Sequence, residues 1–168
     1  GIGAKKVDVT WATEESGLLL GVSIKSINFR DTRSQNFQKN LTNRRGDMLF
    51  EAVTLHRRFP YAVLGGLFLL NEAAATDGTA KRKSTFVNTH ARLRLFSGRA
   101  DPAGREEQYE HLFVVLHRAD DTLSAYAVGD SENEVTFEEV LARLIDTIAL
   151  RNPDFYEVVE GMLVSVRA

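Results

Sequence analysis

The fold is decided by the opening stretch of the chain, residues 5–27, which reads KKVDVTWATEESGLLLGVSIKSI. Apolar and polar residues alternate over residues 5–12, and this period of two, with β-branched and aromatic side chains, predicts a β-strand. Residues 18–27 are richer in Leu, Val and Ile, which is typical of a strand inside a sheet. The polar residues 13–17 between them predict the turn of an antiparallel hairpin.

Downstream, helical and strand patterns alternate along the chain. We expect helices over 44–58, 86–96 and 137–150, strands over 61–70, 111–118 and 123–128, and a final helix near 155–163. Thr136 and Glu139 have the spacing of a capping box at the start of the third helix. A helix between a strand and a buried strand is typical of a βαβ unit. The pattern therefore predicts an α/β fold with a mixed β-sheet flanked by helices.

Length and composition indicate one domain, residues 1–168, with a core at 5–70 and an acidic helical part at about 131–168. The chain has no cysteine, which excludes thiol catalysis and a disulfide scaffold. Its longest apolar runs are about half of what a membrane span needs. No signal peptide opens the sequence, so we expect a cytoplasmic protein without membrane contact.

Charge is distributed unevenly along the chain. The net charge is −2, but residues 1–100 carry 16 Lys and Arg against 8 Asp and Glu, which is +8. Residues 101–168 carry 5 against 15, which is −10. An excess of this size predicts a partner for the basic half, most often nucleic-acid phosphate. The alternative is that the two halves fold against each other and neutralise part of the charge.

Three polar residues of the hairpin are expected on one side of it. In an alternating strand Ser23 and Lys25 share a face, while Ile24 points into the core. Pairing around the turn places Asp8 opposite residue 22, or beside Ser23 after a small change of register. A carboxylate can hold Mg²⁺ (or Mn²⁺), and a neighbouring lysine can orient or deprotonate water, which is the chemistry of metal-assisted phosphodiester hydrolysis. The backbone carbonyl of Ile24 would complete the metal site. The alternative is a solvated ion pair.

Val7-Asp8, then Gly21-Val22-Ser23-Ile24-Lys25, then a helix and an apolar strand together resemble the PD-(D/E)xK nuclease superfamily, which has the restriction-endonuclease-like fold. The resemblance covers mainly residues 5–70. It implies that Asp8 is the metal-binding aspartate and Lys25 the catalytic lysine. It also implies a magnesium-dependent DNA endonuclease that acts in restriction-modification or another form of defence.

Position 23 departs from this pattern, because the superfamily has Glu or Asp where this chain has Ser23. Some restriction enzymes of the superfamily resemble this arrangement, with the glutamate supplied by the following helix. Glu51 is then the candidate for the second carboxylate. The superfamily core also begins with a helix and a strand before the aspartate, so a residue upstream of Gly1 is the other source. The alternative function is a catalytically weak or inactive module of the same fold that binds DNA or a partner protein. Among partners, a second copy of the chain in a homodimer is also considered.

A basic run follows the candidate site and consists of Arg30, Arg33, Lys39, Arg44 and Arg45. A nuclease needs phosphate contacts close to its metal, so we expect these residues to bind the DNA backbone. Arg44 and Arg45 gain nothing from the helix dipole, which favours negative charge at a helix start. The alternative is an ordinary solvated loop and helix start. Lys81–Lys83 would be a second DNA-contacting element or a mobile solvated loop.

Other conspicuous residues favour structural roles. His56 lies on the apolar face of its predicted helix and is expected to be a core histidine. His90, His111 and His117 lack the mutual spacing of a zinc site. Gly65-Gly66 lies inside a predicted strand without the Lys-Ser/Thr of a phosphate loop, which indicates close packing against a helix.

Overall fold

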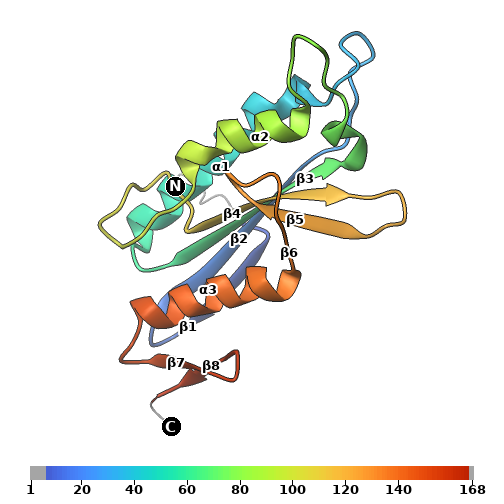
Figure 1. Cartoon of the computed structure of the whole chain (residues 1–168). Coiled ribbons are helices and arrows are strands. Elements are labelled where there is room, and N and C mark those ends of the chain that lie inside the picture. Colours follow the sequence, from blue (N-terminus) through green and yellow to red (C-terminus); the bar gives the residue numbers. More distant parts are fainter. Residues whose placement is uncertain (1–6, 167–168) are drawn as a thin grey trace.

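The computed structural model describes residues 7–166 and shows a six-stranded mixed sheet between helices (Figure 1). The strand order is β1-β2-β3-β4-β5-β6. The bounds are β1 (Val9–Thr13), β2 (Gly17–Ile27), β3 (Val63–Asn71), β4 (His111–His117), β5 (Leu123–Ala127) and β6 (Glu134–Val135). Strands β2, β3 and β4 run parallel, and the remaining neighbours pair antiparallel. The prediction of a mixed α/β sheet is confirmed.

Helices cover both faces of the sheet. Helix α1 (Leu41–Arg58) and helix α2 (Thr85–Leu93) lie over one face, and α3 (Phe137–Arg151) lies over the other (Figure 1). Helix α3 begins with the predicted capping box, in which the Thr136 hydroxyl and the Glu139 carboxylate each accept a bond from the other residue's backbone N–H. Short 3-10 turns occupy Gln38–Asn40, Glu72–Ala75 and Arg94–Phe96. Within residues 7–166, no helix combines the length and hydrophobicity needed to cross a membrane.

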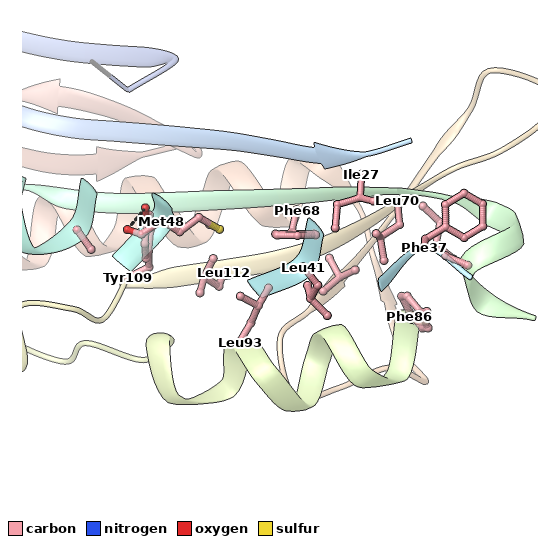
Figure 2. Packing of buried hydrophobic residues seen from close by; sticks show 14 of the residues in the cluster. Ile27, Phe37, Leu41, Met48, Phe68, Leu70, Phe86, Leu93, Tyr109 and Leu112 are labelled. Atoms are coloured by element: carbon pink, nitrogen blue, oxygen red, sulfur yellow. Dashed lines mark hydrogen bonds between the residues drawn. The ribbon is translucent and has the colours of Figure 1, made fainter. Parts of the chain in front are cut away.

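The sheet separates two apolar cores. Under α1 and α2, buried side chains such as Leu41, Phe68 and Leu93 pack together (Figure 2). On the opposite face, α3 packs Leu144 and Ile148 against the sheet. Each core follows from the periodic apolar positions of its helix and the unbroken apolar run of β3 beneath it.

Gly65 and Gly66 in β3 leave no room for a side chain, because residues of α1 and α3 pack directly over them. A Cβ added to Gly66 would lie 2.8 Å from Cε of Met48 in α1 and 2.5 Å from Cδ2 of Leu112. A Cβ added to Gly65 would lie 3.0 Å from Cδ2 of Leu144 in α3. The prediction of close packing against a helix is therefore confirmed, and it holds on both faces of the strand.

The C-terminal segment differs from the expectation. The predicted helix near 155–163 is wrong, because β7 (Tyr156–Val159) and β8 (Met162–Ser165) form an antiparallel hairpin. Its turn residues Glu160 and Gly161 both have positive φ, at 50° and 76°, which is the conformation of the tight hairpin turn whose twist suits β-strands. Of the acidic part predicted to be helical, Phe137–Arg151 forms a long helix, and the hairpin packs against it.

Candidate functional site

Asp8 is held beside the middle of β2. Val9 pairs with Val22, and the backbone N–H of Asp8 donates to the Val22 carbonyl at 3.0 Å. The carboxylate Oδ2 of Asp8 accepts a bond from the backbone N–H of Ile24 at 2.6 Å. An irregularity in the ladder between Trp11 and Ala12 shifts the register by one residue. This shift brings Asp8 alongside Ser23.

Glu51 reaches the same place from α1. Its carboxylate is buried, with Oε2 accepting a hydrogen bond from the Ser23 hydroxyl at 2.5 Å. Its other oxygen, Oε1, lies 2.8 Å from Nζ of Lys25. The structure thus brings together four predicted site residues, Asp8, Ser23, Lys25 and Glu51, from the start of the chain, β2 and α1.

Small residues in the sheet make room for this carboxylate. Ser23 pairs with Gly66 in the parallel ladder of β2 and β3, and both positions lie under α1. Met48, one turn before Glu51, packs over Gly66. A bulky residue at either sheet position would push α1 away from the sheet. The small Ser–Gly pair lets the Glu51 carboxylate come within hydrogen-bonding distance of the Ser23 hydroxyl. Glu51 and Lys25 are 5% and 14% exposed, so their attraction is screened little by water.

Ile24 lies on the more open face of β2. The expectation that its side chain points into the core is wrong, because Ile24 is 39% exposed whereas Ser23 is fully buried. Alternation along β2 holds, but α1 covers the face of Ser23. Helix α3 rests on the other face nearer to Gly65 and leaves Ile24 open. The backbone of Ile24 nevertheless lies beside the Asp8 carboxylate.

Tyr109 is a site residue that the sequence pattern does not mark. Its buried hydroxyl donates to the backbone carbonyl of Met48 at 3.0 Å, which ties α1 to the segment before β4. Burial, followed by the nearby carboxylate of Glu51 and more weakly that of Asp8, raises the pKa of Tyr109, so the hydroxyl stays protonated. The contact spans 61 residues, and no local motif signals a partner so distant.

The donor atoms at this site suit a hard cation. Asp8 and Glu51 would supply carboxylate oxygens and Ile24 a backbone carbonyl, which are the ligand types that Mg²⁺ and Mn²⁺ take up. Over residues 7–166, no group of three or more His, Cys, Asp or Glu side chains gathers as a metal cluster. A cation here would therefore depend on two carboxylates, a backbone oxygen and water, and Mg²⁺ commonly keeps several waters.

The predicted basic residues lie after β2 and along the start of α1. Arg30 donates from Nε to the Gln35 carbonyl, Lys39 lies 3.2 Å from Asp31, and Arg33 is exposed. Arg44 lies 3.8 Å from Asp47, and the Arg45 guanidinium is 5.7 Å from the centre of the Phe96 ring. Arg44 precedes Glu51 by seven residues, about two helical turns, so both lie along the same side of α1.

The long helices of the two oppositely charged parts of the sequence lie on opposite faces of the sheet. Helices α1 and α2 come from the basic first hundred residues, whereas α3 and the β7–β8 hairpin come from the acidic remainder (Figure 1). The ion pairs Arg57–Glu106 and Arg99–Glu110 join the two parts. Part of the opposite charge of the two halves is therefore neutralised between them.

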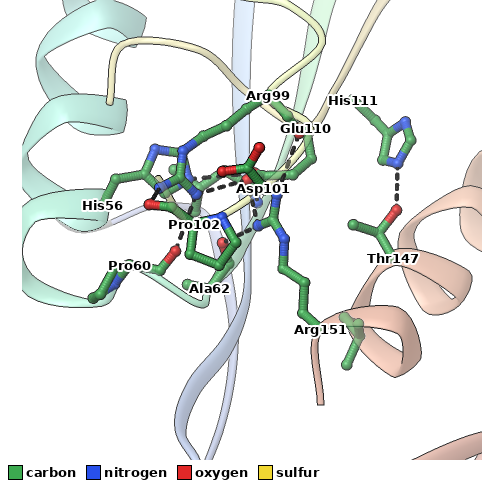
Figure 3. Close-up of polar contacts among 12 residues, drawn as sticks. His56, Pro60, Ala62, Arg99, Asp101, Pro102, Glu110, His111, Thr147 and Arg151 are labelled. Carbon is green, nitrogen blue, oxygen red and sulfur yellow. Dashed lines mark hydrogen bonds and ion pairs between the residues drawn. The ribbon is translucent and has the colours of Figure 1, made fainter. Parts of the chain in front are cut away.

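A second polar cluster is built around Glu110 and lies at the far end of α1 (Figure 3). Its carboxylate contacts Arg99 at 3.1 Å, Arg151 at 2.5 Å and Nε2 of His56 at 3.3 Å, all of them buried. Burial opposes ionisation of Glu110, but the bond from His56 and the nearby cations outweigh it and lower the pKa of that carboxyl. His56 is buried among these groups, so the prediction of a core histidine is confirmed.

Comparisons of the chain with protein families, with curated proteins and with solved structures found no match. What the protein does must therefore be argued from the chemistry of its own residues.

Proposed function

We propose that this chain is a metal-dependent deoxyribonuclease of the PD-(D/E)xK, restriction-endonuclease-like type, which hydrolyses phosphodiester bonds in DNA with Mg²⁺ or Mn²⁺. The observation that carries the proposal is the convergence of Asp8, Glu51 and Lys25. The Asp8 carboxylate contacts the backbone of Ile24, and Glu51 contacts the side chains of the residues on either side of it, Ser23 and Lys25. These groups come from three different segments of the chain. A hairpin followed by a helix and a parallel strand, in the order β1, β2, α1 and β3, supports the same assignment.

Each residue has a role that follows from its position. Asp8 and Glu51, with the carbonyl of Ile24, would hold the cation, which when bound polarises the scissile phosphate and lowers the pKa of water. Lys25, as an ammonium group, would orient the attacking water and neutralise charge that develops on the phosphate, while the proton of the water passes to solvent. Attack forms a new bond from the water oxygen to phosphorus, the bond to the leaving oxygen breaks, and that oxygen takes up a proton from solvent.

Ser23 and Tyr109 act as positioning residues. The Ser23 hydroxyl donates to Glu51 and leaves the carboxylate little rotational freedom. The Tyr109 hydroxyl holds the preceding turn of α1 through the Met48 carbonyl. Pre-organised groups of this kind lower the cost of reaching the reactive geometry. Arg44 and Arg45 on the same helix would bind phosphates of the DNA next to the cleaved bond.

One observation favours a second candidate function, an inactive module of the same fold that binds DNA or a partner protein. Both oxygens of Glu51 are engaged, one by Ser23 and one by Lys25. A carboxylate satisfied in this way can serve as a structural ion pair without any cation. Cleavage activity separates this candidate from the nuclease.

The test is cleavage of supercoiled plasmid with Mg²⁺ or Mn²⁺ and with EDTA. We expect nicked or linear DNA with the cations and intact plasmid with EDTA. Asp8→Asn should abolish cleavage and keep the fold, because a neutral amide is a poor ligand for a hard cation. Asp146→Asn, an exposed carboxylate on α3, is the matched control and should cleave normally. Intact plasmid with every cation, or full activity of Asp8→Asn, would overturn the nuclease assignment.

A further inference from the structure

Two basic loops leave the sheet at the same edge. Strands β2 and β3 are parallel, and their last paired residues are Ile27 and Leu70. Because the carboxyl ends of parallel strands meet at one edge, the segments 28–40 and 72–84 start next to each other. Figure 1 shows these two segments side by side beyond the start of α1.

Buried Asp77 joins the loops into one unit. Its Oδ2 accepts bonds from the backbone N–H of Phe37, at 3.2 Å, and from the Thr85 hydroxyl, at 2.5 Å. Its Oδ1 accepts from the backbone N–H of Thr85 at 2.7 Å. Phe37 is itself anchored in the core near Phe86 (Figure 2). One carboxylate therefore fixes the end of the first loop to the end of the second.

The surface of this unit is basic. The loops carry Arg30, Arg33, Lys39, Lys81, Arg82 and Lys83. Arg82 turns inward and donates to the Asp77 carbonyl, whereas Lys81 and Lys83 are exposed. Of the acidic residues within 28–40 and 77–84, Asp31 pairs with Lys39 and organises its own turn, and Asp77 is buried. The outward charge is therefore positive on both loops.

This unit lies close to the candidate site. Lys25 precedes the end of β2 by two residues, which at about 3.3 Å per residue is roughly 7 Å along the strand. A nucleic-acid strand that continues from the site along β2 would reach the loops within a few nucleotides. We propose that residues 28–40 and 77–84, joined by Asp77, form a single platform that binds the phosphate backbone of the DNA beyond the cleaved bond. This inference rests on the proposed function.

The platform is tested by the salt dependence of DNA binding. The full chain is titrated in EDTA against a fluorescent 20-base-pair duplex at several KCl concentrations. The double variant Lys81→Ala/Lys83→Ala should weaken binding to unrelated duplex sequences about equally. It should also lower the slope of log affinity against log salt by about 0.9 for each phosphate that the variant no longer binds. The matched control is Arg57→Ala/Arg58→Ala, which removes the same charge at the far end of α1 and should change the slope little.

Asp77→Asn tests the joint between the loops. Counting charges alone predicts tighter DNA binding, because a negative charge is removed. The platform predicts weaker binding, because the amide of the variant cannot accept all three hydrogen bonds and the two loops would separate. In that case the backbone amide hydrogens of Phe37 and Thr85 should also exchange faster with solvent. An unchanged salt slope in Lys81→Ala/Lys83→Ala overturns the platform, as does tighter binding by Asp77→Asn.

The two proposals fail in distinguishable ways. If the wild-type chain cleaves plasmid while the lysine variant keeps its salt slope, only the platform is lost. If the wild-type chain binds duplex with the expected slope changes but never cleaves, the platform stands and the nuclease is lost. Stronger binding to polyglutamate than to DNA would assign the loops to an acidic protein segment and overturn the platform.

Discussion

Glu51 in α1 and Lys25 in β2 form an ion pair of 2.8 Å across 26 residues of sequence. The pair places a helical carboxylate where the strand itself offers Ser23, and Ser23 donates its hydroxyl hydrogen to that same carboxylate. The strand position therefore carries a hydroxyl, and the carboxylate beside it comes from the helix. The energetics of this arrangement can be probed one group at a time.

Glu51→Gln should abolish most cleavage, and it should also lower the free energy of unfolding, because the mostly buried Lys25 ammonium loses its counter-ion. The amide keeps the shape of the side chain but removes the charge that would hold the cation and that now pairs with Lys25. We expect at least about a hundredfold loss in the single-turnover rate, equivalent to about 2.7 kcal/mol. Ser23→Ala, which removes one hydrogen bond, should cost about tenfold or less. Wild-type cleavage by Glu51→Gln would mean that the second carboxylate comes from another residue.

Arg44→Ala/Arg45→Ala should weaken DNA binding without regard to sequence. If both side chains bind phosphates, the salt slope falls by about one for each phosphate released. Fluorescence anisotropy over a range of salt concentrations measures the slope. Arg105→Ala, a basic residue in the acidic part of the chain, is the control and should leave the slope unchanged. Lower thermal stability with an unaltered slope would instead show that the two arginines are structural, Arg45 through its stacking on Phe96.

Replacing Gly65 or Gly66 by alanine should lower stability in both cases but slow cleavage only at Gly66. The two positions point to opposite faces of β3, towards Leu144 in α3 and Met48 in α1 respectively. Overpacking at either should lower the free energy of unfolding by about 1–3 kcal/mol, measured in urea. Gly66→Ala should also slow cleavage, because α1 carries Glu51, whereas Gly65→Ala should cleave like wild type. Equal effects of both variants on cleavage would contradict the placement of the site under α1.

His90 should make the fold less stable in acid. Burial lowers its pKa from 6.5 to about 4, although the Asp130 charge opposes the shift, and its Nδ1 accepts a bond from the Gly129 backbone. In the unfolded chain His90 takes up a proton near pH 6.5, whereas in the folded chain it takes up that proton only near pH 4. Stability is therefore lost as pH falls through this window, by up to about 3 kcal/mol.

His90→Asn removes this titration and keeps an acceptor for the Gly129 amide. The difference in unfolding free energy between wild type and variant should shrink steadily as the pH of the urea titrations is lowered from neutral towards the pKa of His90. A difference that stays constant with pH would show that His90 titrates alike in both states.

Much of the fold could be predicted because its signals are local. The helical period over residues 44–58, the capping box at Thr136 and the apolar run of β3 each appear within a short window. Helix α1 begins at Leu41, earlier than predicted, because its first turn is anchored by a buried leucine in an otherwise polar stretch. The C-terminal hairpin escapes prediction because its turn, Glu160-Gly161, lacks the Asn or Asp that usually marks this turn type.

The candidate site depends on tertiary contacts that no short stretch of the sequence indicates. Alternation along β2 correctly separates Ser23 from Ile24, but which face is covered depends on where α1 and α3 cross the sheet. The pairing of Asp8 depends on a one-residue irregularity in the hairpin, which composition does not reveal. Tyr109 meets Met48 only after the chain has returned to the sheet through β3 and α2.

The contacts of the Glu110 carboxylate link the local unfolding of three segments. It is the shared counter-ion of Arg151 in α3 and Arg99 in the long loop before β4, and it also contacts His56 near the end of α1. Loosening any one of these segments leaves buried charge on the others, which is costly. The last turns of α1 and α3, which lie on opposite faces of the sheet, should therefore lose their amide protection together, as one cooperative unit held by electrostatic linkage across the sheet.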